Sequence, residues 1–598
     1  MQQYIFTIHS NSNIQIKYLN TMRKIFRSAF LALAVFASQS LFAQVSHGGE
    51  PLFNHSPAKA TINTRYLPEI DNDLYLQQDI NGVKGAGPMR VSIGQQCDID
   101  VLADAKKSKD DNGVHYTLAI QSPGATFVTL KFSSFQLADG AELFIYDETG
   151  DFVLGKFIKS DVMKDGRFFT QSIPGSTAYI EYNVPAGVEP GKIVLSHVLH
   201  GYKDIFGMID GVYQDAEANL KGPHGTAEGT CHPDVICPEG DGWRDQIRSV
   251  VALSLDFTCQ FTYGGRTYES VVGGMCTGSV INNTSLDRTP YILSAFHCQD
   301  GESLLEDLVN DYPDIHVVDL DVTAYFLYEK YTCGGAGGSS NKSMTGAEIV
   351  AKYNYNTGSD MLLLRLNDTI PSRYKPYYAG WDREVVISPE PGACIHHPGG
   401  DFKKISLPKS ITADGNFYKV SWFTGADNKG VTEQGSSGSP LFNADKRIVG
   451  QLYAGSSFCN VTSGKDYYGR LSTSWEGGGL TPSRLKSWLD PIGSNVSYLD
   501  GLDYPGSTAA INNPQPSDAH SQMTVYPNPS DGMVHFDVDY LGKANYKVFD
   551  LSGRCVKEGS TVLTSTVQCI DLRSLPKGSY VLSLWAGSKI YSAQIIKQ

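Results

Sequence analysis

A glycine-rich turn, Gly435-Ser436-Ser437-Gly438-Ser439-Pro440, stands immediately before the apolar pair Leu441-Phe442. Serine is a poor nucleophile unless a base takes its proton and hydrogen-bond donors stabilise the oxyanion that forms. On a tight loop the Ser437 hydroxyl can be exposed, and the backbone N–H groups of Gly435 and Ser437 can point to one spot. Similar turns also connect ordinary strands. The stretch therefore predicts a nucleophile only if a histidine and an acid support it.

Both supporting residues occur upstream of the serine. His297 ends a strand-like run in Leu293-Ser294-Ala295-Phe296-His297-Cys298, and Asp360 comes directly before the apolar run Met361-Leu362-Leu363-Leu364-Arg365-Leu366. In this interpretation His297 is the general base and then the general acid, while Asp360 fixes the imidazole tautomer and stabilises the imidazolium. Ser437 attacks the carbonyl carbon. Each residue alone also fits a structural role, but their order and flanking motifs together favour catalysis.

Motifs around these residues resemble one protease family. The chain order His, Asp, Ser is that of chymotrypsin, and Cys276-Thr277-Gly278-Ser279-Val280-Ile281-Asn282-Asn283 is similar to the histidine region of that fold. The match is closer to the bacterial lysyl endopeptidases. Further segments resemble this family in the same order: Cys231-His232-Pro233-Asp234-Val235-Ile236-Cys237-Pro238-Glu239-Gly240-Asp241-Gly242, Ala379-Gly380-Trp381-Asp382, Ile395-His396-His397-Pro398 and Ser483-Arg484-Leu485-Lys486-Ser487-Trp488-Leu489-Asp490-Pro491.

The resemblance covers about residues 222–503. It implies an all-β fold with a chymotrypsin-like double β-barrel. It also implies a secreted serine endopeptidase that hydrolyses peptide bonds on the carboxyl side of lysine through an acyl-enzyme, without a cofactor. The alternatives are the same fold with arginine or broader specificity, and a non-catalytic surface adhesin or peptide-binding pseudoprotease.

Lysine specificity requires a carboxylate partner for the buried ammonium group. Six residues before the serine, where trypsin-like enzymes often carry an aspartate, this chain has Val431. Asp466 resembles the aspartate that lysyl endopeptidases place at the base of the primary pocket, and Glu433 is a closer acid that could instead cap the loop. Tyr453 stands where the family has a pocket-side histidine, and the tryptophan on which that histidine stacks has no clear match here.

The position before the nucleophile also departs from chymotrypsin-like zymogens. These usually activate when a new N-terminus pairs with an aspartate at that position, which here is Ser436. We therefore expect activation by removal of an N-terminal pro-domain. The stretch Leu220-Lys221-Gly222-Pro223-His224-Gly225 is a candidate cleavage segment, and Lys221 is a candidate for autocatalytic processing.

Composition limits the remaining possibilities. The charges sum to 49 − 63 = −14, which argues against a nucleic-acid partner.

Eleven cysteines indicate disulfides and an oxidising compartment. A Cys276–Cys298 bridge would fix the loop that carries the base, and the resemblance implies the pairs Cys231–Cys459 and Cys237–Cys333. Cys259 could pair with Cys394, or both could be free buried thiols, and Cys555 with Cys569 could staple the C-terminal region. No tight Cys/His cluster predicts a metal site, and for the adjacent His396 and His397 we expect structural roles, because neighbouring strand residues point to opposite faces.

The rest of the chain indicates export. Residues 1–43 contain an export signal whose true start is expected at Met22. Residues 44–221 read as a β-sandwich propeptide, with a permanent accessory binding domain as the alternative reading, and 222–503 as the protease domain. Residues 504–521 read as a linker.

Residues 522–598, opening with Val525-Tyr526-Pro527-Asn528-Pro529, resemble the C-terminal sorting domain of the type IX secretion system, a small β-sandwich. A carbohydrate- or protein-binding β-sandwich is the alternative for this tail. We expect a secreted or cell-surface protein that passes through the periplasm, with the type IX secretion machinery and protein or peptide substrates as partners and a monomeric mature form.

Overall fold

The computed structural model describes most of the chain. The described residues are 49–56, 59, 61–81, 87–161, 166–205, 231–335, 338, 342–384, 392–423, 429–459, 463–504, 520–526, 528–538, 542–550, 554–563, 568–586 and 589–597. The expected export signal and the candidate cleavage segment at 220–225 lie outside them. Within the described ranges, no helix combines the length and the apolar character that crossing a membrane requires. The domain boundaries given above remain predictions.

The N-terminal part is a β-sandwich, as predicted. One sheet has the order β1-β4-β10-β6-β7, with β3 paired to β4, and the second contains β2, β11, β5, β8 and β9. Apolar side chains of both sheets, such as Leu118 and Ile145 from the first and Leu130 and Leu195 from the second, form one buried cluster. The bounds are β1 Asn63–Tyr66, α2 Asn72–Asn81, β2 Met89–Asp100, α3 Val101–Asp104, β3 Lys106–Lys109, β4 Gly113–Gln121, β5 Phe127–Leu137, β6 Glu142–Tyr146, β7 Val153–Phe157, β8 Phe168–Phe169, β9 Ile173–Pro174, β10 Thr177–Pro185 and β11 Gly191–Gly201.

A first barrel follows in the chain. Its strands pair in the order β12-β13-β14-β18-β17, and β15 pairs with the free side of β12. Leu253, Ile292 and Leu364 from three of these strands are fully buried in its core. The bounds are α4 Arg244–Ser249, β12 Val250–Tyr263, β13 Arg266–Val280, β14 Tyr291–Ala295, α5 Glu306–Asp311, β15 His316–Tyr325, β16 Ser343–Thr345, β17 Ala347–Tyr353 and β18 Met361–Leu366.

A second barrel repeats this pairing scheme. Six strands of each barrel correspond in chain order: β12, β13, β14, β15, β17 and β18 in the first, and β21, β22 with β23, β24, β25, β26 and β27 in the second. In both sets the first strand pairs with the second and fourth, the third with the sixth, and the sixth with the fifth. The all-β double-barrel prediction is therefore confirmed. The bounds are β19 Tyr377–Tyr378, β20 Trp381–Asp382, β21 Ala393–His396, β22 Lys404–Ser406, β23 Pro408–Asp414, β24 Phe417–Trp422, β25 Pro440–Phe442, β26 Ile448–Gly455, β27 Asp466–Arg470, α6 Leu471–Glu476, α7 Lys486–Leu489, β28 Tyr498–Leu499 and β29 Leu502–Asp503.

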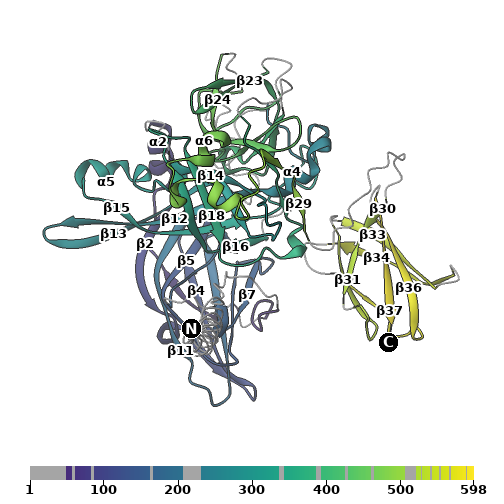
Figure 1. Ribbon diagram of the computed structural model, residues 1–598. Helices are drawn as coiled ribbons and strands as arrows, with labels where there is room; N and C mark the ends of the chain where they lie inside the picture. Colours follow the sequence, from purple (N-terminus) through teal and green to yellow (C-terminus); the bar gives the residue numbers. More distant parts are fainter. Residues whose placement is uncertain are drawn as a thin grey trace, which may run out of the picture. The chain divides into compact units, whose positions relative to one another are not determined.

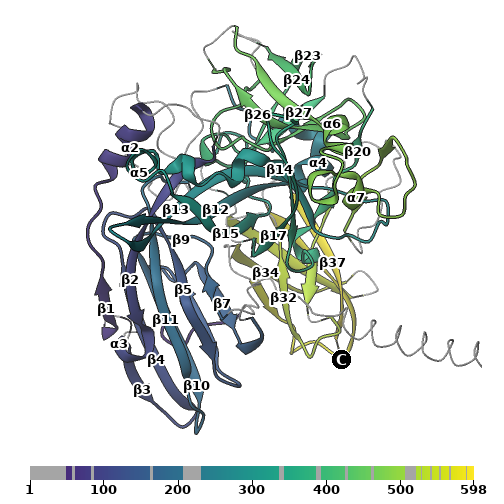
Figure 2. The same ribbon diagram turned by 60° about the vertical axis from the view of Figure 1, so that its left-hand side comes forward.

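The N-terminal sandwich shares a sheet with the first barrel, which the sequence did not indicate. Strand β2 pairs antiparallel with β13, with Ile93 opposite Val272 and Met89 opposite Met275, so one sheet runs from the sandwich into the barrel (Figures 1 and 2). The Lys131 ammonium lies 2.8 Å from the Asp321 carboxylate across this junction. The two parts are therefore joined by a strand ladder and a buried ion pair as well as by apolar packing.

The C-terminal part is a small β-sandwich. Its larger sheet has the order β30-β37-β36-β33-β34 and its smaller one β31-β32-β35, and Val534 and Ile570 of the small sheet share a buried cluster with Val548 and Leu582 of the large one. The bounds are β30 His520–Gln522, β31 Thr524–Tyr526, β32 Met533–Asp537, β33 Gly542–Asp550, β34 Cys555–Leu563, β35 Gln568–Asp571, β36 Gly578–Ala586 and β37 Lys589–Lys597.

Candidate active site

Strand pairing brings the candidate base and its acid together. β14 ends at Ala295, a 3-10 turn over Phe296–Gln299 follows, and Ala295 lies opposite Met361 at the start of β18. Asp360, the residue before Met361, therefore comes next to the turn that carries His297. The imidazole Nδ1 lies 2.7 Å from Asp360 Oδ2, and the His297 backbone N–H donates to Asp360 Oδ1 at 3.1 Å. Because a carboxylate accepts the Nδ1 proton, Nε2 is left as the basic nitrogen.

The Asp360 carboxylate is rigidly placed and fully buried. Its residue adopts the left-handed conformation with φ of 58°, and its backbone carbonyl accepts hydrogen bonds from Phe296 N–H at 2.9 Å and Gln451 Nε2 at 3.2 Å. Burial raises the pKa of Asp360, while the neighbouring His297 opposes that rise. Such a carboxylate suits the stabilisation of an imidazolium formed beside it.

The glycine-flanked serine lies against the strands that lead to His297. Thr277 N–H, from β13, donates to the Ser437 carbonyl at 2.8 Å, and a Cβ placed on Gly438 would come within 2.9 Å of Ala295 N. Within the described part of the chain, the Ser437 hydroxyl makes no hydrogen bond to the His297 ring. This bond is often long in free enzymes and tightens when substrate binds.

Two backbone donors on the serine loop are available to an oxyanion. Among the described residues, the N–H groups of Gly435 and Ser437 donate to no acceptor, although the loop around them is heavily hydrogen-bonded. The Gln434 carbonyl accepts from Gly399 N–H at 2.7 Å, and the Ser436 carbonyl accepts from Ser439 N–H at 2.9 Å. In a trans peptide the C=O and the following N–H point in opposite directions. These two anchors therefore fix the directions of both free N–H groups.

Gly435 cannot be replaced without strain in this loop. Its φ is +84°, and an added Cβ would meet the His397 carbonyl at 2.8 Å and Gly400 N at 2.9 Å. Glycine is the residue that adopts such a conformation at no steric cost. The requirement explains why a glycine stands two positions before the serine.

Asp466 opens β27 and is fully buried. Its Oδ2 accepts from Trp422 Nε1 and from Thr432 Oγ1, both at 2.6 Å, and its Oδ1 accepts from Ser457 N–H at 3.3 Å. Burial raises its pKa against these hydrogen bonds. No cationic side chain within the described ranges forms an ion pair with it. A buried carboxylate held only by neutral donors is suited to receive a cation from outside the chain.

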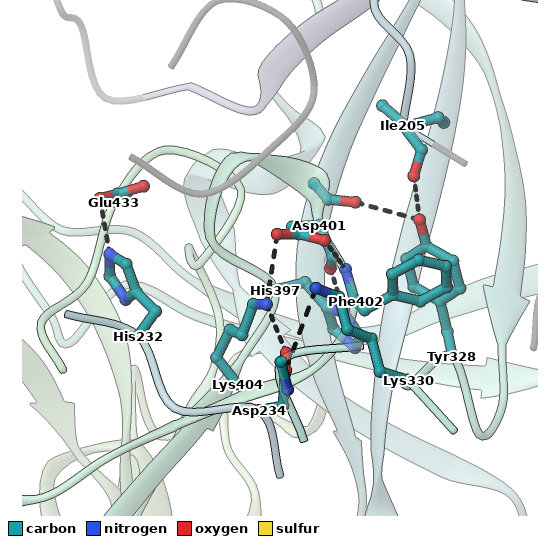
Figure 3. A network of polar contacts seen from close by, with 12 residues as sticks. Ile205, His232, Asp234, Tyr328, Lys330, His397, Asp401, Phe402, Lys404 and Glu433 are labelled. Carbon is teal, nitrogen blue, oxygen red and sulfur yellow. Dashed lines mark hydrogen bonds and ion pairs between the residues drawn. The ribbon is translucent and has the colours of Figure 1, made fainter. Parts of the chain in front are cut away.

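Glu433, the competing acid, already has an internal partner. Its Oε1 lies 2.7 Å from His232 Nε2, and both side chains are almost completely buried. Figure 3 shows the His232 ring turned to this carboxylate, close to a second polar group in which Lys404 contacts both Asp401 and Asp234. Glu433 thus ties its loop to the N-terminal segment of the protease domain, which agrees with the loop-capping alternative.

An aromatic group next to the base was not predicted. The Tyr453 ring stands edge-on to the His297 ring, with centroids 6.2 Å apart, and stacks on Tyr355 at 5.4 Å. Tyr355 and Phe417, whose ring centroid lies 5.0 Å from that of Tyr453, are therefore aromatic partners that the sequence did not reveal. Nothing local in the sequence connects Tyr453 with Tyr355, because they belong to different barrels.

The three predicted disulfides are present. Cys231–Cys459, Cys237–Cys333 and Cys276–Cys298 are bonded, and the last joins β13 to the turn that carries His297. The suggested pairs Cys259–Cys394 and Cys555–Cys569 do not form, since all four are free thiols. The ligand atoms of Cys231, His232 and Cys459 lie within 4.8 Å of one another, but both sulfurs are in the disulfide, so this cluster is no metal site.

Two family models match the chain. Residues 225–469 match "Lysyl endopeptidase, C-terminal domain", and residues 524–598 match "Secretion system C-terminal sorting domain". The chain therefore contains one segment similar to each of these domains. The resemblance to lysyl endopeptidases and to the sorting domain is thereby confirmed. The protein is secreted or located at the cell surface.

Comparison with individual proteins gives a similar sequence and several similar solved structures. The chain is 27% identical over 328 residues to the lysyl endopeptidase of Pseudomonas aeruginosa, an alignment that covers 52% of this chain and 62% of that protein. It therefore spans less than two thirds of this relative's length. Two solved structures are also similar. A thermostable serine protease, AL20, from an extremophilic microorganism is 12% identical with a TM-score of 0.24, and the match covers 38% of this chain and 92% of the other. A Glu endopeptidase is 17% identical with a TM-score of 0.23, and the match covers 38% of this chain and 85% of the other. Scores this low carry no weight for function.

Proposed function

We propose that this protein is a serine endopeptidase that hydrolyses peptide bonds on the carboxyl side of lysine. The observation that carries the proposal is the buried His297–Asp360 pair, 2.7 Å apart, beside a serine loop with two unused backbone N–H groups. The match of residues 225–469 to the lysyl endopeptidase domain supports the same reaction.

In this mechanism the Ser437 oxygen attacks the substrate carbonyl carbon while His297 Nε2 takes its proton. The negative charge that develops on the carbonyl oxygen is stabilised by the N–H groups of Gly435 and Ser437. Collapse of this intermediate breaks the C–N bond, and His297 returns the proton to the leaving amine. Water then attacks the acyl-enzyme with the same base, which releases the acid product and restores Ser437.

The preference for lysine rests on Asp466. Its Oδ2 already accepts two short hydrogen bonds, from Trp422 and Thr432, so its two oxygens are not both open to a side-on guanidinium. Arginine binds carboxylates best through two parallel hydrogen bonds, whereas an ammonium is a compact point charge that needs one accessible oxygen. The donor pattern around Asp466 therefore supports lysine over arginine.

We also propose that residues 44–221 are a propeptide removed on activation, and that the mature protease is a monomer. The pairing of β2 with β13 is the contact through which such a propeptide would assist folding, because it places the N-terminal sandwich on a strand of the first barrel.

The test is a cleavage map. The processed protein and its Ser437→Ala variant are incubated with a peptide library that carries every residue before the scissile bond, and mass spectrometry identifies the cut sites. We expect cuts after lysine only, absent from Ser437→Ala. Cuts after arginine or other residues would support the protease activity but refute the lysine assignment. An intact library, together with no labelling of Ser437 by a phosphonate probe, would instead favour an adhesin or peptide-binding role.

A further inference from the structure

A buried histidine holds the serine loop from behind. His396 ends β21 and is fully buried. Its Nδ1 lies 2.7 Å from Ser436 Oγ, and its Nε2 lies 2.8 Å from Ser406 Oγ. The imidazole thus bridges two hydroxyl groups, one of them on the residue directly before Ser437.

Counting donors and acceptors assigns every proton in this chain of contacts. Ser406 Oγ donates its single proton to the Val431 carbonyl at 3.0 Å, so it must accept from His396 Nε2–H. Nδ1 then carries no proton and accepts from the Ser436 hydroxyl, whose oxygen accepts in turn from Glu433 N–H at 3.1 Å. The chain of hydrogen bonds therefore runs from the Glu433 N–H through Ser436, His396 and Ser406 to the Val431 carbonyl. Each group is satisfied once with a neutral imidazole, as buried polar groups require.

The surroundings keep this imidazole neutral. Burial, with the nearby His232, His397 and Lys404, holds the pKa of His396 well below its ordinary value. The ring of His232 lies 6.1 Å from that of His396 and is itself engaged with Glu433. A proton on Nδ1 would leave the Ser436 hydroxyl without its acceptor. The neutral form is therefore the one that supports the loop.

The bridged segment includes the donors proposed for the oxyanion. Residues 431–436 are attached to the histidine at both ends, through the Val431 carbonyl and the Ser436 hydroxyl. The Ser436–Ser437 peptide carries one of the two free N–H groups, and Gly435 carries the other. In an activated chymotrypsin-like enzyme, an ion pair with the new N-terminus holds the residue before the nucleophile. Here that residue is Ser436, and the neutral His396 holds it through a hydrogen bond.

We propose that His396 is a positioning residue for the oxyanion site, and that it acts through Ser436. The inference rests on the proposed protease function. It predicts that weakening the bridge lowers stabilisation of the transition state but leaves the ground-state binding of substrate unchanged.

The test compares His396→Phe, His396→Gln and Ser436→Ala with His397→Gln. His397 is the matched control: it is adjacent and equally buried, but its ring stacks on Tyr328 and its Nδ1 contacts the Asp401 carbonyl. Each protein is assayed for kcat and KM on a lysine peptide amide. The binding of a lysine peptide aldehyde, which forms an oxyanion on Ser437, is compared with that of the peptide acid product. Urea unfolding measures any loss of stability separately.

We expect His396→Phe and Ser436→Ala to lower kcat and aldehyde affinity together by about 10²-fold, comparable to removal of an oxyanion-hole donor, with KM and product binding nearly unchanged. His396→Gln should recover most of the loss, because its amide supplies an acceptor oxygen for Ser436 and an N–H donor for Ser406 without taking a proton. His397→Gln should keep the wild-type kcat. If His396→Phe does not fold, Ser436→Ala decides, since it removes only a hydroxyl.

Two results would overturn the inference alone: an active enzyme in which His396→Phe and Ser436→Ala keep kcat within threefold, or an equal loss of kcat in His397→Gln. A wild-type protein that neither cleaves nor reacts with the phosphonate probe would overturn the proposed function and this inference with it.

Discussion

Asp360 and Asp466 are two fully buried carboxylates at the starts of strands, one in each barrel. Burial raises the pKa of both. Asp360 has a titratable partner, His297, at 2.7 Å. Asp466 has only neutral donors, from Trp422, Thr432 and Ser457.

The difference indicates separate tasks for the two acids. A carboxylate with an internal partner orients that partner and balances the charge that appears on it during the reaction. A buried carboxylate without a cation costs folding free energy, and such a cost is characteristic of sites that complete themselves with a ligand. In the proposed function the substrate's ammonium is that missing cation.

The largest effect should come from breaking the internal pair. Asp360→Asn replaces an acceptor for His297 Nδ1–H with an amide that favours the wrong tautomer, and in triads this substitution lowers kcat by about 10⁴-fold. We expect that loss with the preference for lysine unchanged, measured as the ratio of kcat/KM for matched lysine and norleucine peptides. An altered ratio would mean that Asp360 and Asp466 are not functionally separate.

Removing the charge of Asp466 should have the opposite effect, a loss of lysine preference with the triad intact. Asp466→Asn removes the charge but keeps the shape. Truncating one partner of a buried, hydrogen-bonded charge pair costs about 2–5 kcal/mol, so we expect kcat/KM for lysine peptides to fall by roughly 30- to 4,000-fold. The kcat/KM for a norleucine peptide should stay close to its wild-type value, because the triad is intact. A lysine preference that survives this change would transfer the role to another acid.

A smaller change should sharpen the argument about arginine. Thr432→Val removes one of the two hydrogen bonds to Asp466 Oδ2 and frees a lone pair for a second guanidinium contact. We expect the arginine-to-lysine ratio of kcat/KM to rise by about tenfold, which corresponds to ~1.4 kcal/mol, the order of one hydrogen bond to a charged group. Thr432→Ser keeps the hydroxyl and serves as the control. An unchanged ratio would show that the two hydrogen bonds to Asp466 Oδ2 are not what excludes arginine.

The sequence suggested these candidate residues through local patterns and through the family resemblance. Asp360 precedes a buried strand, Ser437 lies in a glycine-rich turn, and Asp466 was found by its resemblance to a family motif. Chain order then grouped them before any contact was known. Strand patterns also predicted the all-β architecture, since apolar runs alternate with turns throughout the chain.

Contacts between distant segments that neither a motif nor the family resemblance indicated were beyond this kind of prediction. The pairing of β2 with β13, the stack of Tyr453 on Tyr355 and the bridge from His396 to Ser436 depend on how elements meet in space. The cysteines show the same limit. Cys259 lies in the first barrel and Cys394 in the second, so having two unassigned thiols said nothing about their separation.

The smallest predicted effect is a pH dependence that belongs to Asp466 alone. Only the ionised carboxylate attracts an ammonium, and its pKa is raised above the ordinary 3.8 by burial. The affinity for a lysine peptide product should therefore be constant above that raised pKa and weaken as the pH falls through it, earlier than for an exposed aspartate. A bound ammonium favours the ionised form, so the complex should release its proton at lower pH than the free protein. Calorimetric titration with the product measures binding alone and does not depend on turnover. Asp466→Asn should bind weakly at every pH without this slope, whereas the same slope in that variant would assign the titration to another group.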